Sequence, residues 1–167
     1  MNKKQLIRDG LLIGIVVAVI AIIYLISLLN RKPSEVATVN YNNQPLFSVE
    51  LKSGTLKSQT TVYQVDALPV IKEGKLYIQD TLDTRLEKGK GVIVYNHHYV
   101  ILGNIDYVII QYNQTNQTIR VLEETSPYKI CSTQGESKGA PIVCLPNLVT
   151  ITFGKLDGLD GIIWNYL

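Results

Sequence analysis

The sequence predicts an all-β barrel or sandwich domain behind one N-terminal transmembrane α-helix. A single apolar block lies near the start of the chain, and after it the sequence changes to short alternating runs separated by turn residues. No later window shows the spacing of an amphipathic helix, so strands are the expected elements. Ten tyrosines against two phenylalanines suit half-buried strands whose hydroxyl groups reach water.

The apolar block, residues 10–29, reads GLLIGIVVAVIAIIYLISLL and carries no charged side chain. At about 1.5 Å per helical residue, a run of this length spans the hydrocarbon core of a bilayer. A cleaved signal peptide is the alternative, but its apolar part normally covers only about 7–15 residues and ends in small residues. We therefore expect an uncleaved signal anchor. No cysteine follows the run closely, which excludes a lipoprotein N-terminus.

Basic residues on both sides of this block set its expected orientation. Lys3, Lys4 and Arg8 precede it, whereas Arg31 and Lys32 follow it, so the positive-inside bias is small. Two cysteines in the later domain suit an oxidising compartment. We expect a single-pass protein of the cell membrane, with a cytoplasmic tail (1–9), the transmembrane helix (10–29), a linker (30–35) and an extracytoplasmic domain (36–167).

Turn residues divide this domain into hairpins. The tight turns are expected at Asn42-Asn43, Glu73-Gly74-Lys75 and Asn96-His97-His98. The expected strands are Val36–Tyr41, Leu46–Leu51, Thr60–Val65, Val70–Ile71, Leu76–Ile78, Val92–Tyr95, Tyr99–Leu102, Tyr107–Tyr112, Gln117–Leu122 and Leu148–Phe153.

Two segments fall outside this pattern. Thr81–Gly91 combines charge with glycine and is the best candidate for a mobile loop. The last residues end in an apolar cluster around the sole Trp164. That tail is expected to pack back on the domain, with the bilayer interface or a partner as the alternatives.

The distribution of charge argues against a nucleic-acid-binding domain. The net charge of +2 comes from the N-terminal tail, where Lys3, Lys4 and Arg8 outweigh Asp9, and the rest of the chain is neutral. Nucleic-acid binding usually needs a basic face, because neutralising phosphates supplies much of the affinity. Composition therefore gives no reason to expect a nucleic-acid partner.

The only two cysteines, Cys131 and Cys144, bracket Gly135, Gly139 and Pro141, so the chain between them can double back and bring the sulfurs together. A disulfide here would stabilise the fold by roughly 3 kcal/mol in the chain-entropy model. Two free buried cysteines remain the alternative. A redox-active pair lacks the Cys-X-X-Cys spacing, and a zinc site lacks a standard set of four ligands.

Residues 130–153, ICSTQGESKGAPIVCLPNLVTITF, resemble the signature of the NusG domain II family. These small all-β modules occur as inserts in some NusG proteins and more often as stand-alone, membrane-anchored bacterial proteins. Cys131 matches the family's second cysteine and Gly135 its glycine. The segment that matches outright consists of Ile142, Val143, Cys144, Leu145, Pro146 and Asn147. Ser126-Pro127 stands where the family often has Cys-Pro, so a three-cysteine metal or redox site is not expected.

The resemblance is weaker over Val36–Leu51 and Ile119–Glu124, and residues 64–102 look like an insertion. It implies strongly bent sheets and no established activity, and it leaves Cys131 and Cys144 as one disulfide. From their chemistry, Ile142, Cys144 and Leu145 read as apolar packing residues. Pro146 should end strand pairing, and Asn147 should hydrogen-bond nearby backbone in a turn. A ligand cleft against the Cys131 loop is the alternative.

No set of residues predicts catalysis, a cofactor or a metal. His97-His98 is expected in a solvated turn, and Glu123-Glu124 point to opposite faces of a strand, which excludes a shared acid/base pair. We expect a non-enzymatic protein that binds a membrane or extracytoplasmic protein partner and meets the bilayer through residues 10–29. The alternative, from the anchored relatives, is an accessory component of a membrane redox or cofactor-transport system linked to flavin electron transfer.

Overall fold

The computed structural model describes residues 3–29, 34–126 and 128–154. The chain divides into two units, Met1–Pro33 and Ser34–Leu167. The first unit contains α1 (Lys3–Leu29), whose side chains are described from residue 12 to residue 26. Within the described residues, no helix combines the length and the hydropathy that a membrane crossing requires. The expected span, 10–29, continues past the described side chains at both ends, and the Trp164 tail lies outside the described residues.

The second unit is mostly β, which confirms the β character predicted for this part of the chain. Its strands are β1 (Val36–Tyr41), β2 (Gln44–Glu50), β3 (Leu56–Ser58), β4 (Val62–Gln64), β5 (Val70–Lys72), β6 (Lys75–Ile78), β7 (Thr81–Asp83), β8 (Val92–Tyr95), β9 (His98–Leu102), β10 (Tyr107–Asn113), β11 (Thr118–Glu124), β12 (Ile142–Cys144) and β13 (Val149–Gly154). The short helices are α2 (Ile130–Thr133) and the 3₁₀ turn η1 (Leu145–Asn147).

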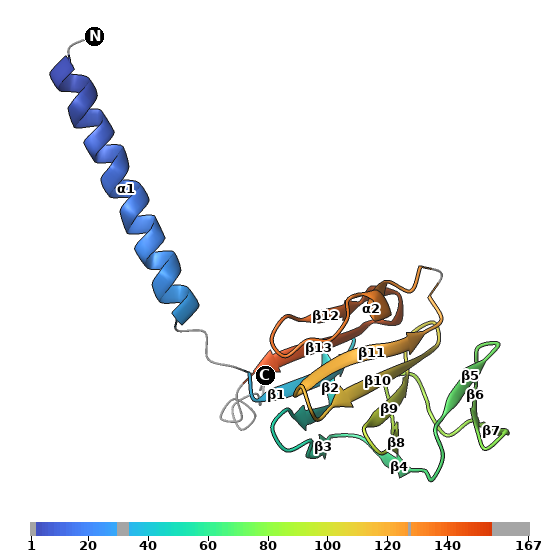
Figure 1. The fold of residues 1–167 in the computed structure, drawn as a ribbon. Helices are drawn as coiled ribbons and strands as arrows, with labels where there is room; N and C mark the ends of the chain where they lie inside the picture. The colour runs from blue at the N-terminus through green and yellow to red at the C-terminus, as the bar shows by residue number, and fades with distance from the viewer. Residues whose placement is uncertain (1–2, 30–33, 127, 155–167) are drawn as a thin grey trace, which may run out of the picture. The chain divides into compact units, whose positions relative to one another are not determined.

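The strands form three sheets (Figure 1). Sheet A has the order β12-β13-β1-β2-β3, and sheet B has the order β11-β10-β9-β8-β4. Sheet C is the small meander β5-β6-β7. Neighbouring strands run antiparallel except β4 and β8, which are parallel. Register shifts interrupt the β1–β2 and β10–β11 ladders, and such bulges bend the strands that contain them.

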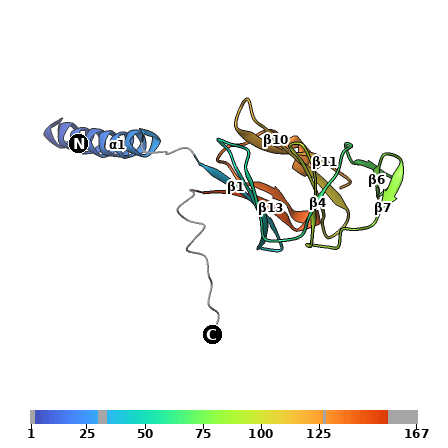
Figure 2. The same ribbon diagram turned by 90° about the horizontal axis from the view of Figure 1, so that it is seen from below.

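Side chains of sheets A and B together form the main hydrophobic core. Figure 2 shows strands of both sheets from below. Along most strands alternate residues point inward, as the two-residue period requires, but in β2 the register shift places both Leu46 and Phe47 in this core. Phe47 of β2 meets Tyr99 of β9 with ring centroids 5.2 Å apart. The Tyr112 hydroxyl donates a hydrogen bond of 2.6 Å to the Leu51 carbonyl, which satisfies a buried polar group between the two sheets. Burial and the neighbouring Tyr112 raise the pKa of Tyr99 to about 12.

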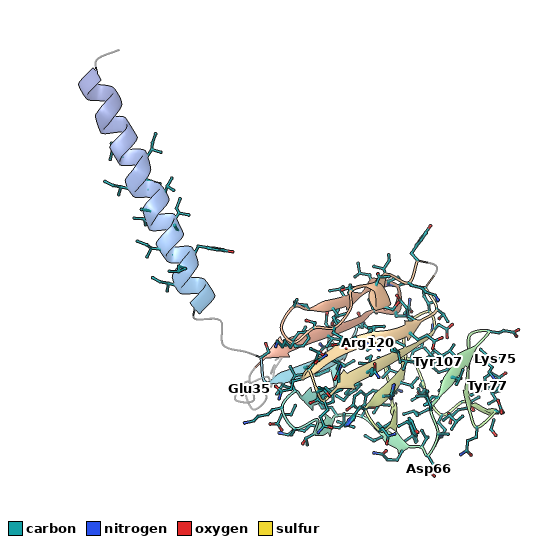
Figure 3. The ribbon with its side chains drawn as sticks, viewed as in Figure 1. Glu35, Asp66, Lys75, Tyr77, Tyr107 and Arg120 are labelled. Atoms are coloured by element: carbon teal, nitrogen blue, oxygen red, sulfur yellow. A yellow bond between two sulfur atoms is a disulfide. The ribbon has the colours of Figure 1, made fainter. Side chains whose placement is uncertain are left out.

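A second core lies on the opposite face of sheet B, where sheet C covers it. Val100 of β9 and Ile109 of β10 point into this core, while their neighbours point into the main core. Ile71 and Leu76 of sheet C supply the facing side chains. The middle strands of sheet B are therefore apolar on both faces, and Tyr107 packs at the margin of the second core (Figure 3).

The segment 64–102, expected as an insertion, supplies both sheet C and two strands of sheet B, β8 and β9. Thr81–Gly91, expected as a loop, instead begins with β7 and buries Leu86. The charges and glycines of this segment indicated a loop, and a strand of three residues is too short to show an alternating pattern. The short strand β3 and the single-turn α2 were also not predicted.

The first and last strands of the β domain are neighbours in sheet A. β1 and β13 are antiparallel neighbours, with Val36 opposite Gly154. The Glu35 amide donates a hydrogen bond of 2.9 Å to the Gly154 carbonyl. Glu35, labelled in Figure 3, thus marks the place where the chain both enters and leaves sheet A.

Candidate functional site

The sulfurs of Cys131 and Cys144 form a disulfide at the edge of sheet A. Cys131 lies on α2 and Cys144 ends β12, with Cα atoms 5.1 Å apart. Both residues are buried in the main core. The bond therefore fastens α2 to the edge strand. Gly135 follows α2 with φ at +76°, a left-handed conformation that glycine adopts without steric cost, and this turns the chain back toward β12.

The side chain of Glu124 lies against this bond. Its carboxylate is almost completely buried, with 2% of the residue exposed. Oε1 accepts hydrogen bonds from the backbone amides of Cys131, at 2.5 Å, and Ser132, at 3.3 Å. Oε2 lies 3.2 Å from Cys144 Sγ. The carboxylate therefore holds the start of α2 with one oxygen and contacts the disulfide with the other.

A bulge places this carboxylate inside the domain. Ile110 of β10 pairs with Val121 of β11, but the next residue, Ile109, pairs with Glu123, so Leu122 is the extra residue. Strict alternation from Val121 would turn Glu123 toward the core. The inserted residue reverses the alternation, and Glu124 points inward while Glu123 is exposed. The expectation of opposite faces for the two glutamates is met, but their difference in burial was not foreseen.

Asn147 is the other buried polar group beside the disulfide, with no exposed surface. Its Oδ1 accepts hydrogen bonds from the backbone amides of Ile105, at 3.2 Å, and Asp106, at 3.0 Å. Its Nδ2 points at Cys144 Sγ from 3.9 Å. The predicted bond to backbone exists, but it reaches across to the β9–β10 turn of sheet B and not within its own turn. Asn147 thereby joins the two sheets.

The remaining residues of the Ile142–Asn147 segment alternate in exposure. Ile142 and Cys144 are buried as expected, whereas Leu145, expected to pack, is exposed like Val143. Pro146 lies in η1 after strand pairing has ended. The Gln134 side chain covers the open edge of β12: its Nε2 donates to the Val143 carbonyl at 2.8 Å, and its Oε1 accepts from the Val143 amide at 3.1 Å. The Gln134 side chain thus makes the two hydrogen bonds with Val143 that a neighbouring strand would otherwise make.

Apolar side chains stand out from the disulfide-bonded segment toward solvent. They are Tyr128, Ile130, Val143, Leu145 and Leu148, which we call the apolar face. Leu145 is 72% exposed. Leu145 and Leu148 also line a shallow cleft of about 170 Å³ with Cys144 and the β1–β2 turn residues Asn42 and Asn43. No residue of the Cys131 loop lines this cleft, so it is not the ligand cleft against that loop that the sequence offered as an alternative.

The chemistry available at this site is limited by the disulfide. In the described part of the chain, Glu124, Cys131 and Cys144 form a group of potential metal ligands whose donor atoms all lie within 4.8 Å of one another. Zinc and similar metals bind cysteine as thiolate, and neither sulfur is a thiolate in the oxidised state. In the oxidised state the two cysteines form a structural cross-link, and the Glu124 carboxylate lies against it.

The two histidines singled out in the sequence make separate contacts. His97 meets Tyr112 edge to face with ring centroids 5.5 Å apart, whereas His98 begins β9 and its Nε2 lies 3.2 Å from Gln111 Nε2. Burial is the main cause that lowers the pKa of His98, so this ring is largely neutral at neutral pH. The two rings therefore have different neighbours. Both residues are partly buried and only His97 lies in the turn, so the expected solvated turn is wrong for His98.

Glu136, which sequence reasoning did not single out, fastens the loop after α2 to the β10–β11 hairpin. It accepts hydrogen bonds from Thr118 Oγ1 at 2.7 Å, Asn113 Nδ2 at 3.1 Å and Asn116 Nδ2 at 3.2 Å. These three donors, Thr118 foremost, lower the pKa of the Glu136 carboxyl. Next to it, Ser137 and Ile119 exchange both backbone hydrogen bonds, which covers the edge of β11.

Comparison with protein-family models and with curated protein sequences gave no match. Among solved structures, the chain is similar to the Lin0431 protein from Listeria innocua, with 14% sequence identity and a TM-score of 0.36. The match covers 72% of this chain and 95% of the Listeria chain. A likeness of this degree carries no inference about function.

Proposed function

We propose that this chain is a non-enzymatic accessory protein held at the membrane surface, whose NusG domain II-like β domain binds another protein through the apolar face. The observation that carries the proposal is the exposure of five apolar side chains, each within four residues of a disulfide-bonded cysteine. Exposed apolar groups are typical of protein-binding surfaces. Because the Gln134 side chain covers the edge of β12, we expect the partner to bind the exposed side chains and not to add a strand to sheet A.

Membrane attachment is supported by the character of α1. Residues 10–29 carry no charge, and every side chain described from residue 12 to residue 26 is exposed (Figure 3). A helix that is apolar on all sides needs an apolar environment. The proposed topology has residues 1–9 in the cytoplasm and the β domain outside, where an oxidising compartment would maintain the disulfide. The resemblance of residues 130–153 to the family signature supports the same placement.

Membrane attachment and topology are tested in whole cells of the source organism. Alkaline carbonate extraction should leave the chain in the membrane pellet. A cysteine introduced by Asn96→Cys, at the exposed tip of the β8–β9 hairpin, should react with an impermeant maleimide added outside the cells. Extraction into the soluble fraction would contradict the anchor, and protection of position 96 would reverse the orientation.

Partner binding is tested by site-specific photo-crosslinking. A crosslinking amino acid at Leu145 of the apolar face is compared with the same group at Leu82, an exposed apolar residue of β7 in sheet C. We expect a discrete product at position 145 that is absent at position 82 and is lost when Val143 is changed to Asp. Identical products at both positions would contradict the proposed docking surface. A flavoprotein or transporter in the product would favour the redox or cofactor-transport alternative.

A further inference from the structure

The two oxygens of Glu124 have unequal surroundings while the disulfide is intact. Oε1 has two backbone donors. Oε2 faces Cys144 Sγ, which carries no proton in a disulfide, and no other described group donates to it. A buried carboxylate oxygen without a donor is costly, because burial has removed the water that would otherwise solvate it. The oxidised centre therefore leaves half of this carboxylate unsatisfied.

Reduction of the disulfide supplies the missing donor. A thiol at Cys144 has its sulfur 3.2 Å from Oε2, within reach of an S–H···O hydrogen bond. A thiol is a weak donor, but hydrogen bonds to charged acceptors are stronger than neutral ones, and a low local dielectric strengthens them further. The carboxylate consequently interacts more favourably with the dithiol than with the disulfide.

We propose that Cys131–Cys144 is a thiol–disulfide exchange site for a small dithiol reductant, and that Glu124 shifts its equilibrium toward the dithiol by accepting the Cys144 proton in a hydrogen bond. Cys144 lines a cleft together with Leu145 and Leu148, and the proposed reductant approaches the buried bond from this side. Its apolar rim suits an uncharged dithiol better than a charged thiol such as glutathione.

The exchange proceeds in two balanced steps. A thiolate of the reductant attacks Cys144 Sγ, the Cys131–Cys144 bond breaks, and Cys131 leaves as a thiolate that takes up a proton. The reductant's second thiolate then attacks the sulfur bonded to Cys144, which closes the oxidised reductant and releases Cys144. Cys144 takes up the second proton and donates it in the hydrogen bond to Glu124. The two electrons and two protons gained by the protein are those that the dithiol loses.

The equilibrium is measured on the full-length chain in detergent, incubated with mixtures of reduced and oxidised dithiothreitol at constant pH. Thiols are trapped by alkylation and counted by intact mass. Glu124→Gln keeps an oxygen for the two backbone donors but offers no charged acceptor to Cys144. We expect this variant to lower the equilibrium constant for reduction about tenfold, which for a two-electron couple is a potential about 30 mV more negative.

The matched control is Glu123→Gln, which removes the neighbouring, exposed carboxylate. It should leave the equilibrium constant within about twofold of the unmodified protein, because a solvated charge is screened. An unchanged or larger constant in Glu124→Gln would overturn the proposal. The measurement involves neither a membrane nor a partner, so its outcome is independent of the function proposed above.

A second readout does not depend on the folding of a Glu124 variant. Cys131→Ser leaves Cys144 as the only thiol of the chain. Its S–H stretching band in the infrared spectrum should lie at lower frequency than that of a thiol in water and should be broadened, because the thiol donates to a carboxylate. A band at the position of a non-bonded thiol would overturn the proposal.

Discussion

Replacement of Asn147 by alanine is expected to weaken the joint between sheets A and B. The substitution removes the Oδ1 atom that accepts from the Ile105 and Asp106 amides. A net amide hydrogen bond contributes about 0.5–1.5 kcal/mol, so the two together amount to about 1–3 kcal/mol. Ile105 as a residue is 60% exposed, so water can compensate part of the loss at that amide. We therefore expect the free energy of unfolding to fall by about 2 kcal/mol.

The assay is urea unfolding with the disulfide intact, followed by near-ultraviolet circular dichroism of the tyrosines. Asn104→Ala is the matched control, because Asn104 is exposed and its side chain makes no described hydrogen bond. It should stay within about 0.5 kcal/mol of the unmodified protein. The denaturant dependence should be the same for all three proteins, since each exposes similar surface on unfolding. A loss for Asn147→Ala no larger than that of the control would refute the assignment of Asn147 as the joint.

Three further outcomes are expected. Gln134→Ala uncovers the Val143 edge of β12 and should increase concentration-dependent self-association in size-exclusion light scattering, whereas Gln134→Glu should do so less because it still accepts from the Val143 amide. Gly103→Ala should lower the melting temperature, because its Cβ would lie 2.7 Å from Asn147 Cβ. For Glu136, the folded-state pKa lies below the usual 4.5, so the ionised carboxylate adds stability above that pH and the benefit disappears in more acidic solution. The melting temperature of Glu136→Gln should therefore be lower than that of the unmodified protein at neutral pH and should converge with it as the pH falls below about 4.

The hairpins could be predicted because their turn chemistry is local. Asn42 and Asn43 both adopt positive φ, at 47° and 63°, as a two-residue turn between strands requires, and their sequence alone indicates it. Glu73-Gly74 follows the same logic, with φ at 51° and 71°. In such cases a few adjacent residues determine both the bend and the register of the flanking strands.

The site could not be predicted to the same degree, because its polar groups are satisfied by other elements of the fold. Glu124 receives its donors from α2, seven and eight residues along the chain. Asn147 receives its donors from the β9–β10 turn, 41 and 42 residues away. The bulge at Leu122 decides which glutamate is buried, and it is defined by the register between β10 and β11. The one available signal was the apolar residue Leu122 breaking the alternation after Val121.

The hydrogen bond between Glu35 and Gly154 has a consequence for how this domain can be used within other chains. A domain whose first and last strands lie within hydrogen-bonding distance can be inserted into a surface loop of another protein, because the two ends of that loop need not move apart. The same domain can also be attached to the rest of a chain by its N-terminal connection alone. The pairing of β1 with β13 is therefore compatible with either arrangement.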